Sequence, residues 1–373
     1  MSVFPKKPAD DVPARHPLRQ RIPMTAKLVA LTGRSFARIG AICLLGMFGM
    51  AGAGVTQALA APGDAPVHVP HADANGASIV PVLQRARDAA RKKNYVGTFV
   101  VMSSSGATAS SRIWHLSDGN QQVERMESLS GSPRHVLRRN DQVTTYLPDS
   151  HTARTEVRDT YGLFPHLPRV QETALGDYYR VRSKGSERVA GFDTEVFQLS
   201  ARDGLRYGYR LWVERRTGFA VQLQTLDKTG AVLEQAAFSD LQFDVPLRAD
   251  KMQQAIGSTA GYKVEKLERV RTSADVEGWL MRNAVPGFEP MDCYKKAADA
   301  PPGAVQWIFS DGLATVSLFI EPYGSRPRQE WRSAAGMTQM VGRRVAQDWW
   351  LTAMGEVPSQ TLEAFAATLE RRP

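Results

Sequence analysis

The spacing of hydrophobic residues along the chain changes at about residue 95. Residues 78–94 place Ile79, Leu83 and Ala90 on one helical face, with basic side chains on the other side and near the end. This periodicity of about 3.6 residues predicts an amphipathic helix. From Tyr95 onward, hydrophobic and polar residues alternate with a period of two, which predicts half-buried strands.

Twelve short alternating segments follow the predicted helix, and we expect about eleven of them to become strands. Each junction in the second half of the series pairs a glycine with a polar residue, as tight hairpins require. A large, curved antiparallel sheet with the helix on its concave face would bury this pattern, giving an α+β first domain over residues 78–245. The segments are 95–101, 110–116, 122–129, 135–139, 143–147, 153–158, 178–184, 188–190, 194–202, 207–215, 220–227 and 232–243.

The last third of the chain predicts a second, smaller α+β domain. Residues 246–261 carry proline, charges, glutamines and small residues, as a linker does, and the smaller domain would occupy 262–373. We expect strands over 288–294, 306–309, 315–320 and 345–354, with helices over 273–281 and 358–370.

The first 60 residues predict a signal for export. Ile39 to Val55 is an uncharged run behind a basic flank, and Ala58-Leu59-Ala60 supplies the small residues of a cleavage site. Met24 is an alternative start, and the run from Ile39 to Gly63 is long enough to act instead as an uncleaved membrane anchor. Residues 61–77 would form a flexible segment ahead of the first domain.

Charge and composition disfavour nucleic-acid binding and most enzyme classes. The net charge is +9, of which residues 1–60 hold +6, so a near-neutral +3 remains for the other 313 residues. All seven histidines occur at or before His166, in no metal-like spacing, and the mature chain keeps one cysteine, Cys293. We therefore expect no catalytic residues, no cofactor and no metal.

Several segments together resemble the MucB/RseB family of sigma-E factor regulatory proteins. The resemblance covers about residues 78–370, and the set of segments is more specific than any one of them. It rests on Asn94–Val100, Arg112–His115, Val123–Gly131, His135–Arg139, Arg206–Trp212, Leu280, Pro286–Phe288, Ser310–Glu321 and Gly355–Pro358.

This resemblance implies a fold, a compartment and a partner. It implies a periplasmic protein with a large domain similar to the lipoprotein carriers LolA and LolB and a smaller C-terminal domain. It also implies binding to the periplasmic region of a single-span anti-sigma factor, protection of that region from the site-1 protease, and release by lipid or lipopolysaccharide. No nucleic acid is implied, and whether two copies of the chain form a homodimer stays open.

Partner-binding residues are expected in two places. The loop around Tyr161, Phe164 and Leu167 is apolar and held by prolines, so it suggests a lid or contact surface, or a plug for the sheet. Two arginines, Arg169 and Arg182, could bind lipid phosphates or acidic peptide groups.

The adjacent tryptophans Trp349 and Trp350 face opposite ways on a strand, so one of them would be exposed as an interface anchor.

Two other functions compete with the regulator. The first domain alone would suit a lipid or lipoprotein carrier, and a periplasmic hydrolase would need a histidine–carboxylate pair that the sequence does not display.

Overall fold

A computed structural model describes residues 79–158, 175–254, 259–296, 303–325 and 327–372. Its first element is the helix α2 (Val80–Lys92), which confirms the predicted helix. Pro81 stands in its first turn, where the missing N–H costs no helical hydrogen bond. Arg91 and Lys92 occupy its last turn, where positive charge stabilises the helix dipole. Its apolar stripe consists of Val80, Leu83, Ala86, Ala89 and Ala90.

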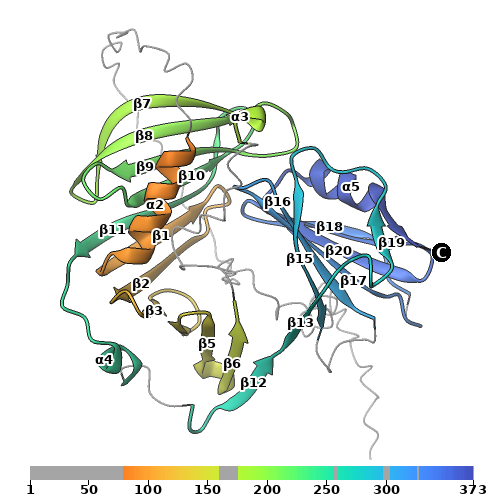
Figure 1. The fold of residues 1–373 in the computed structure, drawn as a ribbon, viewed down its shortest axis with the longest axis horizontal. Helices are drawn as coiled ribbons and strands as arrows, with labels where there is room; N and C mark the ends of the chain where they lie inside the picture. The colour runs from red at the N-terminus through yellow and green to blue at the C-terminus, as the bar shows by residue number, and fades with distance from the viewer. Residues whose placement is uncertain (1–78, 159–174, 255–258, 297–302, 326, 373) are drawn as a thin grey trace, which may run out of the picture. The chain divides into compact units, whose positions relative to one another are not determined.

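The large sheet contains twelve strands in the order β12-β6-β5-β4-β3-β2-β1-β11-β10-β9-β8-β7, so it is an open sheet with β12 and β7 at its edges (Figure 1). Neighbouring strands from β1 to β11 all pair antiparallel, as the meander pattern predicted. The strands are β1 (Tyr95–Ser103), β2 (Thr108–Ser117), β3 (Gln122–Ser128), β4 (His135–Arg139), β5 (Gln142–Leu147), β6 (Thr152–Val157), β7 (Tyr179–Val189), β8 (Phe192–Ala201), β9 (Gly208–Glu214), β10 (Ala220–Leu226), β11 (Val232–Phe243) and β12 (Lys263–Leu267). The one-turn helices η1 (Pro148–Ser150) and α3 (Leu175–Tyr178) precede β6 and β7.

Helix α2 lies across one face of this sheet (Figure 1). Leu83 and Ala86 pack into a cluster with Leu199, Tyr209 and Leu211 of the strands beneath. Gly97 in β1 is required by close packing, since a Cβ there would lie 2.6 Å from the Phe238 ring. The helix thus packs against the sheet through two core clusters, one holding Ala89 and Ala90 and the other Leu83 and Ala86.

The turn between β7 and β8 differs from its predicted position. Residues 178–184 and 188–190, expected as two strands, form the single strand β7, and β8 begins at Phe192 rather than at residue 194. Ala190 and Gly191 both have positive φ, at 48° and 84°, which is the two-residue turn whose twist matches antiparallel strands. A glycine at the second position accepts this geometry without strain.

Strand β12 differs from every other strand of the large sheet because it pairs in parallel, with β6. It follows the short helix α4 (Ala249–Gln254), whose Met252 packs against Leu116 and Val123 on the sheet. The sequence pattern predicted neither element, and it placed residues from 262 onward in the smaller domain. The division at residues 245 and 262 stays a prediction.

The small sheet has seven strands in the order β13-β15-β16-β17-β20-β19-β18. Helix α5 (Ser359–Thr368) packs on it through Leu362 and Phe365, and a separate two-stranded sheet joins β14 to β21. The strands are β13 (Arg269–Thr272), β14 (Trp279–Met281), β15 (Glu289–Lys296), β16 (Val305–Ser310), β17 (Thr315–Pro322), β18 (Trp331–Ala335), β19 (Thr338–Val345), β20 (Trp349–Gly355) and β21 (Leu369–Arg371).

Two predictions for this region were wrong. Residues 273–281 do not form a helix: Gly278 has a φ of 75°, and Trp279 begins a strand that pairs with Arg371. The single strand predicted over 345–354 is the end of β19 and most of β20, separated by a turn in which Ala346 and Gln347 have positive φ. Among the described residues, no helix has the length and apolar character needed to span a membrane.

Candidate binding site

The predicted partner loop falls outside the described residues, since Tyr161, Phe164, Leu167 and Arg169 all lie within 159–174. Of that group only Arg182 can be placed: it is exposed on β7, an edge strand of the large sheet. Its role in binding stays a prediction.

The two adjacent tryptophans point to opposite sides of β20. Trp350 is buried and packs against Tyr323, with a ring-centroid distance of 6.0 Å. Trp349 is half-buried and meets Trp279 edge-to-face at 5.1 Å. The Arg371 guanidinium lies 4.5 Å from the Trp349 ring and 4.9 Å from the Trp279 ring, which is close enough for cation–π attraction. Trp349 is therefore the more accessible of the two, although it is not free of contacts.

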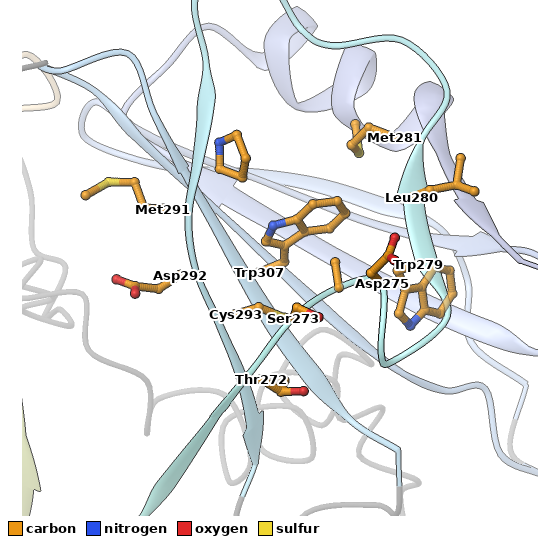
Figure 2. Close-up of a pocket in the computed structure, with 12 residues that line it drawn as sticks. Thr272, Ser273, Asp275, Trp279, Leu280, Met281, Met291, Asp292, Cys293 and Trp307 are labelled. Carbon is orange, nitrogen blue, oxygen red and sulfur yellow. The ribbon is translucent and has the colours of Figure 1, made fainter.

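Beside this aromatic group lies a cavity of about 420 Å³. Figure 2 shows Trp307 and Met291 of the small sheet on one side and Leu280 and Met281 of β14 on the other. The walls of the cavity are mainly apolar and aromatic, as is usual for sites that bind apolar side chains or lipid chains.

The rim of the cavity is polar and internally neutralised. Asp275 forms an ion pair with Arg372, and Asp292 forms one with Arg271. Inside, burial raises the pKa of the Cys293 thiol to about 11, with the nearby Glu277 charge acting in the same direction. The thiol is therefore protonated at neutral pH and is a poor nucleophile.

A second polar feature crosses the α2-bearing face of the large sheet. Tyr95, His115, Glu124 and Arg138 are direct cross-strand neighbours on β1 to β4, and all four are buried. The His115 ring stacks on Tyr95, and its Nδ1 hydrogen-bonds the Lys93 carbonyl at 2.7 Å. Burial lowers the pKa of His115 to about 4, so it stays neutral and fixes the end of α2.

A third feature, Arg206, connects the large sheet to the small sheet. Its side chain is fully buried and forms an ion pair with Asp311, Nη1 to Oδ2 at 2.8 Å. The Tyr179 hydroxyl donates to the same carboxylate at 2.7 Å, and Arg206 Nη2 donates to the Pro286 carbonyl at 2.6 Å. Since Tyr179 and Arg206 belong to the large-sheet half and Asp311 to the turn after β16, this network fixes one half against the other.

Sequence reasoning missed the cavity and this network. The cavity is formed by β13 to β16, of which β13 and β14 were not predicted. Arg206 and Asp311 both stand in segments that carried the family resemblance, but nothing in the spacing indicated that they meet. Within the described residues, no group of three or more His, Cys, Asp or Glu side chains is arranged to hold a metal ion.

Comparison with known protein families matches both halves of the chain. The MucB/RseB N-terminal domain matches residues 78–256, and the MucB/RseB C-terminal domain matches residues 273–370. The chain belongs to the MucB/RseB family. The resemblance of the sequence segments is thereby confirmed.

Individual relatives agree with this assignment. The chain is 29% identical over 300 residues to the sigma factor AlgU regulatory protein MucB of Pseudomonas aeruginosa, covering 77% of this chain and 89% of that protein. It is 23% identical over 293 residues to the sigma-E factor regulatory protein RseB of Escherichia coli K12, covering 78% and 89%.

Solved structures of MucB show the same fold. A crystal structure of MucB in complex with the periplasmic part of MucA superimposes with a TM-score of 0.60 at 26% identity, covering 79% of this chain and 99% of that one. A second MucA/MucB complex from Pseudomonas aeruginosa gives 0.61 at 25% identity, covering 80% and 100%. Members of the family are thus regulatory binding proteins.

Proposed function

We propose that this protein is a periplasmic regulator that binds the periplasmic region of a transmembrane anti-sigma factor and protects it from site-1 proteolysis. The observation that carries the proposal is the match of both halves to a family whose member MucB has been crystallised with MucA. Lipid or lipopolysaccharide would trigger release. The leader over residues 1–60 would direct the chain to the periplasm.

Regulation of this kind needs two linked binding events and no catalysed reaction. A lipid that binds better to a conformation with low affinity for the peptide will release the peptide by shifting the population. The cavity beside Trp279 offers an apolar site, whereas the apolar residues of the sheet face under α2 are already packed as core. The two halves are connected through the Arg206–Asp311 pair, so a change in one can affect the other.

We place part of the anti-sigma contact at the cavity, where an apolar side chain of the peptide would fit between Trp307 and Leu280. Met291→Glu is the direct test, because Met291 lines the cavity and is 43% exposed, so a charge there should spare the fold. We expect at least a tenfold loss of affinity for the anti-sigma periplasmic segment, measured by calorimetry, because an apolar contact would meet an unpaired carboxylate.

The matched control is Met102→Glu, which replaces a methionine that is 44% exposed on β1, away from the cavity. It should bind as the unaltered chain does. If both variants bind the anti-sigma segment as tightly as the unaltered chain does, the cavity is excluded as a contact. If both lose affinity to the same extent, the added charge alone is responsible.

The loop over residues 161–168 is a second proposed contact. Tyr161→Ala combined with Phe164→Ala should weaken capture of the anti-sigma segment in a pull-down. Unchanged capture would remove the loop from the site and leave it as a plug for the sheet.

The open twelve-stranded sheet of the first half keeps a carrier of lipids or lipoproteins as the alternative function. Deleting residues 269–373 distinguishes the carrier from the regulator. The deletion keeps β12, which completes the large sheet. A carrier should retain lipid binding and transport after the deletion. A regulator should lose its affinity for the anti-sigma segment.

A further inference from the structure

One side chain, that of Arg269, contacts both sheets. Arg269 is the first residue of β13, and its Nη2 donates to the Val157 carbonyl at 3.1 Å and to Glu156 Oε2 at 3.4 Å, both on β6 of the large sheet. The Arg269 guanidinium also lies 5.1 Å from the ring of Tyr294 on β15, which is close enough for cation–π attraction. The Glu156 side chain is largely buried, so water weakens this charge-assisted contact less than it would an exposed one.

The backbone leaves no slack between this contact and the large sheet. Strand β12 pairs with β6 over its whole length, and only Glu268 separates β12 from β13. One residue spans at most about 3.6 Å, so a displacement of β12 also moves the start of β13. The position of β13 is therefore tied to the edge of the large sheet by its backbone and by the Arg269 side chain.

The other end of β13 forms part of the cavity wall. Thr272, the last residue of β13, and Ser273 both line the cavity. Thr272 is also the cross-strand partner of Cys293, which lines the same cavity. Strand β13 is the edge of the small sheet and buries little apolar surface of its own, since its Val270 is exposed. Segments with few buried apolar contacts open locally more readily than the core does, so this wall depends on its polar contacts.

We propose that Arg269 is a clasp that positions the cavity wall: the wall stays closed on β15 while Arg269 is bound to β6, and it loosens when that contact breaks. Arg269 is a positioning residue, because it does not itself line the cavity. The inference rests on the proposed function, since the cavity is where we place part of the anti-sigma contact. It adds a route by which a change at the large sheet alters that contact.

Alkylation of Cys293 tests the clasp with no partner present. The chain would begin at residue 62, and mass spectrometry would follow labelling by iodoacetamide at pH 8. In Arg269→Ala we expect labelling about tenfold faster than in the unaltered chain, because loss of a charge-assisted hydrogen bond raises the population of the open wall. Low concentrations of urea should change this rate little, since a local opening exposes little surface, whereas global unfolding responds steeply to urea.

Two further variants show whether the link to β6 is responsible. Arg271→Ala is the matched control, because Arg271 lies on the same strand, is exposed and pairs with Asp292 inside the small sheet. It should be labelled at nearly the rate of the unaltered chain. Glu156→Gln removes the charged partner from the large sheet and should accelerate labelling as Arg269→Ala does, and it serves as the second variant if Arg269→Ala fails to fold. The clasp is overturned if Arg269→Ala and Glu156→Gln are labelled no faster than the unaltered chain, or if Arg271→Ala accelerates labelling equally.

Addition of the anti-sigma periplasmic segment separates this inference from the proposed function. If the segment occupies the cavity, a saturating amount should slow labelling of Cys293 in the unaltered chain and in Arg269→Ala. An unchanged rate with the segment bound would remove the cavity from the anti-sigma contact, whereas the clasp is judged on the rates measured without a partner.

Discussion

At the residue scale, the chemistry of single side chains is set by what surrounds them. Cys293 illustrates this, because it lines a cavity and yet is only 5% exposed. Trp307 is its cross-strand partner, and Thr272 flanks it on the other side. The Cys293 thiol is therefore an apolar packing group at the wall of the cavity.

Alkylation of Cys293 by iodoacetamide at pH 8 should be at least about a hundredfold slower in the native chain than in the chain unfolded by guanidinium. Burial holds the pKa near 11, so only about one thiol in a thousand is ionised at that pH, and the thiolate is the reacting species. Mass spectrometry of a chain beginning at residue 62 would follow this thiol alone, because Cys43 is then absent. Comparable rates in the two states would show that the thiol is open to solvent.

Most of the large sheet could be predicted from single residues and their neighbours. The turn glycines and the alternation of apolar residues are local signals, and they indicated β1 to β11, although β7 was expected as two segments. Arg206 and Asp311 could not be paired in this way, because they are 105 residues apart. The helix expected over 273–281 failed because pairing of Trp279 with Arg371, at the other end of the C-terminal region, outweighed local propensity.

At the element scale, the segment from β12 to β13 has an unusual position. Strand β12 extends the large sheet and β13 the small one, and only Glu268 separates them. Lys263 donates its backbone N–H to the His151 carbonyl at 2.7 Å, and Arg154 Nε donates to Glu265 at 3.0 Å. A single extended segment therefore belongs to both sheets.

Proline at Glu265 should release β12 from the edge of the large sheet. In a strand, alternate N–H groups point the same way, so Glu265 follows Lys263 in donating to β6. Its replacement removes that hydrogen bond and the ion pair with Arg154, so we expect a loss of stability and faster thermolysin cleavage of this segment. Lys266→Pro is the control: its N–H points away from β6, so cleavage should stay slow. Equal sensitivity of the two variants would contradict the parallel pairing.

At the scale of the whole molecule, the buried Arg206–Asp311 pair connects the two halves among the described residues. Both side chains are fully buried, and the Arg206 guanidinium also lies 4.3 Å from the Tyr178 ring and 5.0 Å from the Phe288 ring. Breaking such a pair leaves an uncompensated charge inside the protein, which costs far more than the loss of an exposed pair.

Asp311→Ala should cost about 3–5 kcal/mol and separate urea unfolding into two steps. Tryptophan fluorescence would detect both steps, because Trp114 and Trp212 belong to the large sheet and the other five tryptophans to the C-terminal half. Asp292→Ala is the control on the same small sheet, because its partner Arg271 is 69% exposed, and its loss should cost less than about 1 kcal/mol. A single transition in Asp311→Ala, with stability unchanged, would show that the pair does not connect the halves.

The parallel strand β12 also has a consequence for the order in which the chain can fold. Arg154 and Glu265, which meet across β6 and β12, are 111 residues apart, whereas most neighbouring strands in this sheet are joined by short turns. A chain made from its N-terminus can form the hairpins of β1 to β6 early, but the free edge of β6 must wait until β12 has been synthesised. Until then β6 exposes unpaired backbone groups, as β1 does until β11 follows, and another chain could pair with these edges. Before both edges are closed, the chain is therefore open to aggregation and to chaperone binding.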